Sequence, residues 1–447
     1  MQGAYGELSY FHGLGNSILV LNSHKAMLDL LVKKGNLYCS RPYFVVACEL
    51  MDLINSTAFA PFGKRWRLHR KLARVALSPE ALREYEGTLM TIAAILNRSL
   101  AESPADFINH ARLAAGRVIM STMYGISVDS AQDPYIVRAE AAMDMISKAV
   151  IPGAFLVDLI PALKHVPRWF PFTRFRTVGE TGRSLVAELV AKPFQYVKDE
   201  IAAGTTVPSF TKDVLTKNEL QSERETDEAF EHAVKWAAAS MYAAGQEVIS
   251  SSILNMIMAL ALNPQILRRA QVEIDLVVGR QRDPTLGDQD SLPYIHAIVK
   301  ETLRWHPPLP MDIARASTAD DVYLGYFIPK DTIVIPNIWS LSRAPDPDYP
   351  PEEFHPERFL GGRAHEPLPP SEYCFGFGRR ICPGRGLAEN AIFLMTASIV
   401  AAFDIEPAID AVGQKIPIQV QYSSGLVSLP EDFQCSIKLR TSPLTSQ

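Results

Sequence analysis

The sequence from Ala233 to Leu262 is apolar on almost every side of a predicted helix. Gln246, Glu247 and a run of serines interrupt it, which argues against a membrane span. A helix this long and apolar is unsuited to a protein surface, because it would expose apolar side chains to water. We therefore expect it to run through the core of a large domain.

Apolar periodicity divides the rest of the chain into a helical centre and β-rich parts. Helical patterns continue from Gly63 to about Gly279. The sequence also predicts strands at Leu8–Phe11, Ser17–Leu21, Val322–Ile328 and Thr332–Pro336, and helices at His24–Lys34 and Tyr294–Trp305. The last two strands alternate around residues 329–331, so we expect them to form a hairpin. Polar, turn-rich segments at 204–228, 279–291 and 361–371 are predicted to be surface loops.

Composition narrows the class of protein. The chain has 447 residues, 47% hydrophobic and 21% charged, which is ordinary globular composition and enough for a large enzyme. With 44 Lys and Arg against 49 Asp and Glu, the formal charge of -5 gives no attraction for nucleic acid. Five widely spaced cysteines favour neither a disulfide scaffold nor a zinc site. Residues 1–15 do not form a signal-peptide pattern.

A glycine-rich segment carries the strongest chemical signal. Cys382 lies in the segment 375–386, just before a predicted apolar helix that begins near Leu387. The positive end of that helix, together with Arg379 and Arg380, is expected to stabilise a thiolate, so we predict an easily ionised sulfur. The glycines around it leave room for something flat and wide against the backbone. A planar macrocycle satisfies this requirement.

The same segment contains the pattern F-x-x-G-x-R-x-C-x-G at Phe375, Gly378, Arg380, Cys382 and Gly384. It resembles the ligand loop of the cytochrome P-450 monooxygenases, in which a cysteine thiolate is the axial ligand of haem iron. The resemblance implies haem b as cofactor and Cys382 as the ligand of its iron. It also makes Arg380 the partner of a haem propionate and places the other three residues in the haem-binding loop.

Two further motifs agree with this resemblance. Glu301 and Arg304 stand three residues apart, so they share one face of a helix and can form an ion pair. Arg358 lies downstream in the sequence P-E-R-F. In the P-450 family, residues with this order and spacing form a buried network that shapes the ligand loop. We therefore expect a structural role for Glu301, Arg304 and Arg358.

The basic segment around Trp66 and Arg70 resembles the family's W-x-x-x-R helix, whose tryptophan and arginine reach the haem propionates. Its other basic residues are expected to face an acidic electron-donor protein, although a solvated basic face is the simpler interpretation of the pattern alone. Arg315 likewise matches a position that meets a propionate. His69 and His306 are expected to be satisfied structural histidines.

Within the long apolar helix, the sequence Ala243–Ser252 resembles the family's A-G-x-[DE]-T-[TS] segment. There the glycine opens an oxygen pocket, and the acid and threonine relay protons towards the haem. Gly245 and Glu247 are retained, so both are predicted catalytic residues. Val248 occupies the threonine position and has no hydroxyl, which removes the central link of the relay.

Two serines further along this helix are candidates to replace the missing hydroxyl. Ser251 and Ser252 fall roughly on the same face as Val248, about 4.5 to 6 Å further along the helix axis. A water molecule could bridge that gap, so both serines are included among the predicted catalytic residues. Glu247 is alternatively a structural charge paired with a neighbour.

The resemblance implies the P-450 fold: mainly α (α+β), a single domain over residues 1–447 with a small β-rich lobe from about 1–60 and 313–338. Parts of the sequence are most like fungal, mushroom-type members of secondary metabolism. The implied reaction inserts one atom of O2 into an apolar small molecule, such as a terpenoid, with electrons from NADPH through a flavin-containing NADPH-cytochrome reductase. Because Val248 replaces the threonine, the alternatives are an isomerase or dehydratase that does not activate O2, or a non-catalytic haem-binding protein.

Family resemblance also implies the endoplasmic reticulum membrane as the location. Eukaryotic members usually carry an N-terminal membrane helix, which this sequence does not contain, so we expect a truncated or shortened form. The apolar segment from Ile151 to Phe172 is expected to touch a membrane surface near the substrate entrance.

Overall fold

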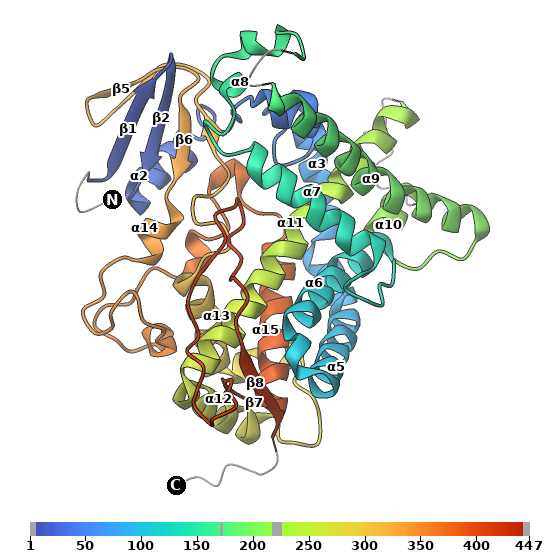
Figure 1. Ribbon diagram of the computed structural model, residues 1–447, viewed down its shortest axis with the longest axis vertical. Helices are drawn as coiled ribbons and strands as arrows, with labels where there is room; N and C mark the ends of the chain where they lie inside the picture. Colours follow the sequence, from blue (N-terminus) through green and yellow to red (C-terminus); the bar gives the residue numbers. More distant parts are fainter. Residues whose placement is uncertain (1–5, 170–172, 217–225, 441–447) are drawn as a thin grey trace.

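The computed structural model describes residues 6–169, 173–216 and 226–440. Figure 1 shows a large helical body with a smaller β-rich lobe at its upper left. The lobe joins strands from the beginning of the chain to strands from residues 315–336. This arrangement confirms the predicted fold class.

Helices make up most of the described chain. The longer ones are α3 (Lys64–Ala76), α5 (Glu86–Glu102), α6 (Phe107–Tyr124), α7 (Pro134–Ala149), α9 (Arg174–Ala203), α11 (Asp227–Leu262), α12 (Pro264–Val277), α13 (Pro293–Trp305) and α15 (Arg385–Ala402). Shorter helices are α2 (His24–Met27), α4 (Pro79–Glu84), α8 (Leu156–Leu159), α10 (Phe210–Thr216) and α14 (Ile338–Ser342). Helix α2 continues as the π-helix η1 (Leu28–Lys33), and a second π-helix is η2 (Val45–Leu50).

The largest sheet has four strands in the order β1-β2-β6-β3. Its strands are β1 (Leu8–Gly13), β2 (Asn16–Leu21), β3 (Arg315–Ala316) and β6 (Ile333–Pro336). β1 and β2 form an antiparallel hairpin around Leu14 and Gly15, which both have positive φ as a tight two-residue turn requires. β6 joins β2 in parallel and β3 antiparallel, so distant segments complete the sheet.

The predicted hairpin around residues 329–331 is wrong. The hairpin instead joins β4 (Asp321–Tyr323) to β5 (Tyr326–Ile328), with Leu324 and Gly325 at its turn. Both turn residues have positive φ, which matches the right-handed twist of the two strands. β6 leaves this hairpin and pairs with β2, because its buried apolar residues belong to the larger sheet.

Two of the predicted surface loops contain ordered structure. The segment 204–228 includes α10, in which Phe210, Thr211 and Val214 are buried; its residues 217–225 lie outside the described part of the chain. The segment 279–291 ends in a 3-10 helix, Leu286–Ser291, with a capping box between Thr285 and Asp288. A second small sheet near the C-terminus pairs β7 (Phe403–Pro407) with β8 (Cys435–Leu439).

Helix α11 runs through the core, as its sequence predicts, and packs against α6, α13 and α15. Its N-cap is Thr226, whose Oγ1 accepts a hydrogen bond from Ala229 N at 3.2 Å, and it ends before Pro264. Within the described residues it alone is long and apolar enough to cross a membrane. However, 78% of its most apolar window is buried inside the protein, which is typical of a core helix.

Candidate active site

The glycine-rich segment 375–386 forms a tight loop that leads into α15. Cys382 N donates to Phe375 O over 2.7 Å, which folds the start of the loop back onto the cysteine. Gly378 has φ of +55°, and a Cβ atom there would lie 2.3 Å from the carbonyl oxygen of Leu31. A side chain at this position would therefore separate the loop from η1.

Cys382 lies directly before the N-terminus of α15, where the sequence places it. Its side chain is accessible to water, yet protein atoms surround it on most sides, and this burial raises the pKa of the thiol. The Gly384 amide and the Arg70 guanidinium lower that pKa by less. The expectation of an easily ionised sulfur is thus wrong for the polypeptide alone, because desolvation outweighs the helix terminus. A metal cation bound to the sulfur would supply the charge that favours the thiolate.

Arginines predicted to hold the cofactor surround this loop. Arg380 is 9% exposed and donates to the carbonyl oxygens of Cys39 and Ala60, each at 2.7 Å. Arg315 is 1% exposed and donates from Nη2 to Phe377 O at 2.9 Å. Its Nε and Nη1 atoms are buried and have no hydrogen-bond partner in the described part of the chain. Buried guanidinium nitrogens without acceptors indicate that this site binds an anionic group.

Sequence reasoning missed a third buried cation, Arg41. It donates to Ala58 O at 2.7 Å and to Ala314 O at 2.8 Å. Burial lowers its pKa, and the nearby charges of Arg380 and Arg315 lower it further. The negative charge of Asp312 raises the pKa of both Arg41 and Arg315, in opposition to their burial. The signal in the sequence is weak, since it consists of one arginine before a proline near an apolar run.

Trp66 and Arg70 on α3 also reach the ligand loop. Arg70 donates to Ile381 O at 2.7 Å, directly beside the cysteine. The guanidinium groups of Arg70 and Arg380 lie 5.8 and 4.7 Å from the centre of the Trp66 ring. The fold therefore brings the sequence-predicted cofactor residues together around one loop.

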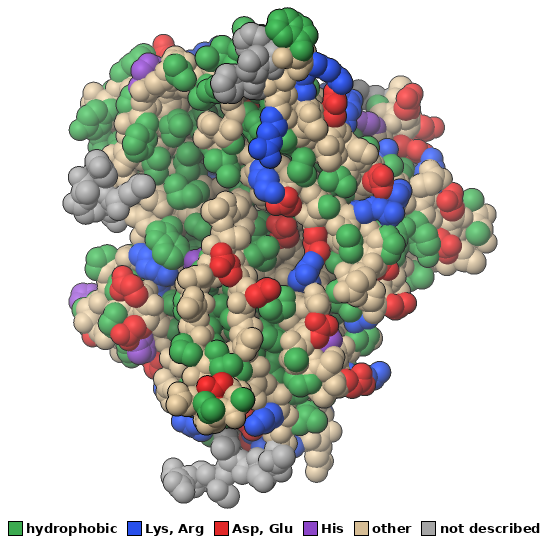
Figure 2. Space-filling view, viewed as in Figure 1, with side chains coloured by type: hydrophobic (Ala, Val, Ile, Leu, Met, Phe, Trp, Pro, Cys, Tyr) green, Lys and Arg blue, Asp and Glu red, His purple; other side chains and the backbone are tan. Residues whose placement is uncertain are grey.

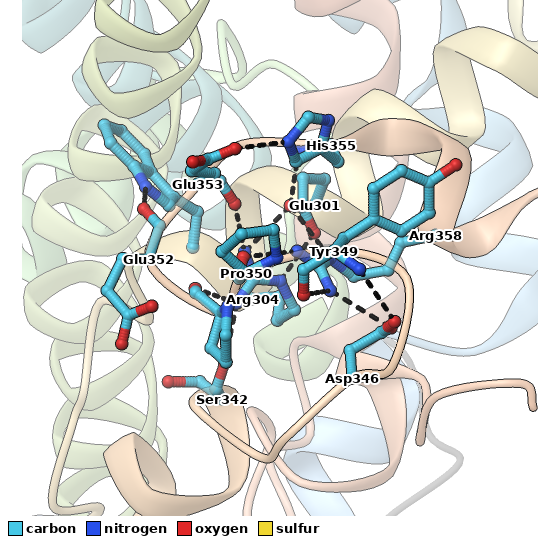
Figure 3. Close-up of polar contacts among 12 residues, drawn as sticks. Glu301, Arg304, Ser342, Asp346, Tyr349, Pro350, Glu352, Glu353, His355 and Arg358 are labelled. Atoms are coloured by element: carbon cyan, nitrogen blue, oxygen red, sulfur yellow. Dashed lines mark hydrogen bonds and ion pairs between the residues drawn. The ribbon is translucent and has the colours of Figure 1, made fainter.

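Glu301, Arg304 and Arg358 form a buried ion network between α13 and the following coil (Figure 3). Glu301 is fully buried and accepts from Arg304 Nε at 2.6 Å and from Arg358 Nε at 3.2 Å. It also accepts from the backbone amide of His355 at 2.7 Å. The ion pair expected from the sequence is present, and Arg358 joins it from the 3-10 helix Pro356–Phe359.

The network extends to an acid that sequence reasoning did not identify. Asp346 lies 3.1 Å from Arg358 Nη1 and accepts from Arg363 Nη2 at 2.7 Å. Arg304 donates to carbonyl oxygens of Ser342 and Pro351, both at 2.8 Å. These bonds tie an irregular coil of the chain to α13, because each guanidinium binds several backbone oxygens at once.

An apolar cavity lies beside α11 and leaves about 690 Å3 free of protein atoms, part of it open to solvent. Its wall brings together residues from α7, α9, α11 and several loops, which include Phe59, Met143, Val186, Trp236, Val248 and Ile313. The serine side chains in the wall already bond within the protein: Ser56 donates to Leu53 O at 2.7 Å and Ser240 to Trp236 O at 2.6 Å.

Comparison with known proteins identifies the family. A cytochrome P-450 family model matches residues 1–436. The chain belongs to the cytochrome P-450 family. It is 36% identical over 440 residues to a cytochrome P-450 monooxygenase of Coprinopsis cinerea, covering 98% of this chain and 83% of that protein. It is 37% identical to another from Ampulloclitocybe clavipes, covering 98% and 81%.

The fold agrees with this assignment. A solved zebra fish cytochrome P-450, in a structure with abiraterone, superposes with a TM-score of 0.77 and 23% identity, covering 98% of each chain. The family match and these relatives show that this P-450 is a haem-dependent monooxygenase, similar to monooxygenases from fungi. In this family NADPH supplies electrons through a reductase.

The residues present suit haem b. Its two propionates carry negative charge, and the site offers Arg70, Arg315 and Arg380 as well as Arg41, with unpartnered nitrogens on Arg315. Cys382 supplies a sulfur donor within the same glycine-rich loop. This combination of one soft ligand and several buried cations matches a metal macrocycle that bears carboxylates.

Gly245 is packed against α6 in this structure. A Cβ atom there would lie 2.5 Å from Cδ1 of Ile119, so glycine allows α11 and α6 to approach closely. Ala243, Ala244 and Val248 face the cavity instead. Helix α11 is continuous through this position, and the sequence pattern alone does not indicate this packing role.

Glu247 lies on α11, two residues after Gly245. Burial raises its pKa to about 7, and the negative charges of Glu140 and Asp144 on α7 contribute further. The neighbouring Gln246 donates to Glu140 Oε1 at 3.4 Å. A carboxyl group with this pKa can both hold and release a proton near neutral pH.

The hydroxyl groups of Ser251 and Ser252 already have partners. Ser251 Oγ donates to Ser428 O at 2.8 Å, and Ser252 Oγ donates to Val248 O at 2.9 Å. Both serines are fully buried, and neither is among the residues that line the cavity. Ser252 lies one helical turn after Val248, to whose carbonyl oxygen it donates.

The two histidines have structural partners. His69 Nδ1 lies 3.1 Å from Thr57 Oγ1, and burial lowers its pKa to about 4. His306 Nε2 lies 2.9 Å from Ser428 Oγ, and burial lowers its pKa to about 3. Both rings are therefore neutral at pH 7. His306 agrees with the expected structural role, whereas the buried Nε2 of His69 has no hydrogen-bond partner among the described residues, so the expectation of a fully satisfied histidine is wrong for His69.

Proposed function

We propose that this P-450 inserts one oxygen atom of O2 into an uncharged, apolar secondary metabolite such as a terpenoid. The observation that carries the proposal is the cavity wall, in which the hydroxyl groups of Ser56 and Ser240 already bond to backbone oxygens. A charged or strongly polar ligand would lose its water there without gaining hydrogen bonds, which disfavours it. An apolar ligand would instead gain from leaving water.

The proposed roles at the haem site follow from the contacts above. Cys382 ligates the iron, and Phe375, Gly378 and Gly384 shape the loop around it. Trp66, Arg70, Arg315 and Arg380 hold the propionates, with Arg41 as an additional member. The bound haem supplies the centre at which O2 is activated. Glu301, Arg304 and Arg358 keep the adjoining coil in place and are structural.

Proton delivery is proposed to depend on Glu247 and a water molecule held by Ser252. Glu247 exchanges protons with solvent on the side of α7, where Glu140 and Asp144 lie. Ser252 has unused acceptor capacity, because its hydroxyl donates only to Val248 O. Ser251 is proposed to support this arrangement by holding the C-terminal segment against α11, and Gly245 by allowing α11 its close contact with α6.

The test uses the purified haem protein with its reductase and NADPH. Terpenoid and indole compounds are first screened for a substrate-induced shift of the haem spectrum, and those that bind are then incubated under air. Oxygenated product, NADPH consumption and inhibition by carbon monoxide are expected together. Product formed without NADPH or O2 would instead indicate an isomerase or dehydratase, and spectral binding without any product would indicate a non-catalytic protein.

We also propose a single catalytic domain, an NADPH-cytochrome reductase as partner and a location at the endoplasmic reticulum membrane. Figure 2 shows hydrophobic side chains over the β-rich lobe and at the top of the molecule near α8. Phe11, Leu14, Leu156 and Trp169 are each at least half exposed. This surface supports contact with a membrane, since scattered apolar residues from adjoining segments can insert together.

Asn16 donates to Leu159 O at 3.2 Å and so joins the β1-β2 turn to α8. The remainder of the predicted membrane segment, residues 170–172, lies outside the described part of the chain. Flotation with phospholipid vesicles tests the contact: Leu14→Ser combined with Trp169→Ser is expected to weaken vesicle binding. Equal flotation of the variant and the original protein would contradict it.

A further inference from the structure

Asp312 occupies a backbone conformation that most residues avoid. It has φ of +49°, in the left-handed region where glycine, asparagine and aspartate are the tolerated residues. Its amide donates to Leu309 O at 3.2 Å, and its Oδ1 accepts from Ile313 N at 2.7 Å. The side chain is thus held in one orientation by its own turn. Backbone conformations of this kind cluster at active sites and ligand-binding sites.

The second carboxylate oxygen, Oδ2, is buried and has no hydrogen-bond partner among the described residues. It lies 3.6 Å from Arg315 Nη2, a distance that allows attraction but not a direct hydrogen bond. The same carboxylate also attracts Arg41 and raises its pKa. Asp312 therefore places a negative charge inside the group of arginines that would bind the haem propionates.

The carboxylate also lies against the ligand loop. A Cβ atom built on Gly376 would be 3.4 Å from Asp312 Oδ2 and 3.6 Å from Oδ1. Residue 376 adjoins Phe375, whose carbonyl oxygen accepts from Cys382 N at 2.7 Å. Asp312 and Glu389 are the carboxylates that raise the pKa of the Cys382 thiol, and Asp312 contributes more. Its charge is therefore fixed against the loop that carries Cys382.

An acid at this place works against haem binding, because the propionates are also negative. The arginines would attract the propionates more strongly without it. Its charge also raises the pKa of the buried Arg41 and Arg315, which offsets part of the cost of burying these two cations. A fixed negative charge near the haem opposes any step that makes the iron centre more negative, and reduction by the electron-donor protein is such a step.

We propose that Asp312 is a positioning and tuning residue of the haem site: its carboxylate restrains Arg315 and lowers the reduction potential of the haem iron. The couple concerned is ferric to ferrous, in which one electron arrives from the reductase and no bond is made or broken at Asp312. The proposal rests on haem binding through Cys382. The negative charge of Asp312 makes transfer of the first electron to the haem less favourable than it would be with the arginines alone.

The first measurement is a spectroscopic redox titration of purified haem protein. Asp312→Asn removes the charge and retains a residue that tolerates positive φ; Asp312→Gly removes the charge and relieves the backbone. Both are expected to raise the ferrous-to-ferric ratio at least about threefold at the midpoint potential of the original protein. A tenfold change would correspond to about 59 mV for one electron. Asp331→Asn is the matched control, because Asp331 also has positive φ but is exposed at a turn before β6.

The second measurement is the affinity of haem-free protein for haem. Asp312→Asn is expected to bind haem more tightly, because a like charge is removed, whereas Asp331→Asn is expected to have no effect. Unchanged potentials in Asp312→Asn and Asp312→Gly, at haem content equal to the original protein, would overturn the proposal. So would an equal shift in Asp331→Asn. Failure of the original protein to bind haem through sulfur would instead overturn the proposed haem site, so the two failures are distinguishable.

Discussion

Substitution of Glu301 is expected to destabilise the folded protein more than substitution of most other residues. Its carboxylate accepts hydrogen bonds from Arg304 Nε at 2.6 Å and Nη2 at 2.8 Å, from Arg358 Nε at 3.2 Å and from His355 N at 2.7 Å. The side chain is 0% exposed, so water cannot replace any of these bonds. Glu301→Gln changes the shape little but removes the negative charge between two guanidinium groups.

The expected loss follows from what remains after the substitution. Arg358 keeps Asp346 at 3.1 Å, but Arg304 is left with backbone carbonyl oxygens and no acid. Removing one partner of a buried ion pair typically costs about 3 to 5 kcal/mol, because the other charge stays in a poorly solvating environment. A domain is stable by only about 5 to 15 kcal/mol, so this loss is a substantial fraction of the total stability.

Unfolding by urea, followed by far-ultraviolet circular dichroism and by the haem absorbance, measures this effect in the purified haem protein. Glu353→Gln is the matched control: the same substitution on the same coil, at a side chain that is 60% exposed and pairs with His355. It is expected to cost less than about 0.5 kcal/mol. Glu301→Gln should unfold at much lower urea and yield little haem-loaded protein.

The reasoning would be refuted by a Glu301→Gln variant that unfolds within about 1 kcal/mol of the original protein and contains as much haem. If such a variant had also lost only its turnover rate, Glu301 would be a catalytic residue and its structural assignment would be wrong. A double substitution adds a further check. Asp346→Asn together with Glu301→Gln should differ from the sum of the single effects, since both acids share Arg358.

Three other outcomes are expected. Cys382→Ala should abolish the red-shifted carbon monoxide band of reduced haem-thiolate protein, and its retention in the variant would disprove ligation by this sulfur. Val248→Thr should raise product per NADPH, and Ser252→Ala should lower it; an unchanged ratio in both would show that this position does not control proton delivery. Because the pKa of Glu247 is raised from 4.5 to about 7, its protonated form favours the folded state, so its contribution to stability falls as pH rises through this interval. Glu247→Gln should flatten that slope in unfolding measurements at several pH values, and an unchanged slope would contradict the assignment.

The local motifs could be read from the sequence because their chemistry depends on short spacings. Glu301 and Arg304 share a helix face at a separation of three residues, and the ligand loop places Cys382 next to a helix start. The apolar character of α11 likewise requires burial wherever the helix lies. These features do not depend on which distant segment lies opposite.

Other features were decided only when distant segments came together. Arg41 reaches the haem site through carbonyl oxygens of residues 313 and 314, and Asp312 meets the ligand loop through Gly376. The turn at Gly325 displaced the expected hairpin because β6 found its partner in β2, near the start of the chain. The thiol pKa also depends on the whole surrounding fold, since desolvation is set by all nearby atoms and a helix terminus contributes only one part. Sequence spacing thus determines which groups a short segment presents, and tertiary packing determines which charges, partners and amount of water those groups meet.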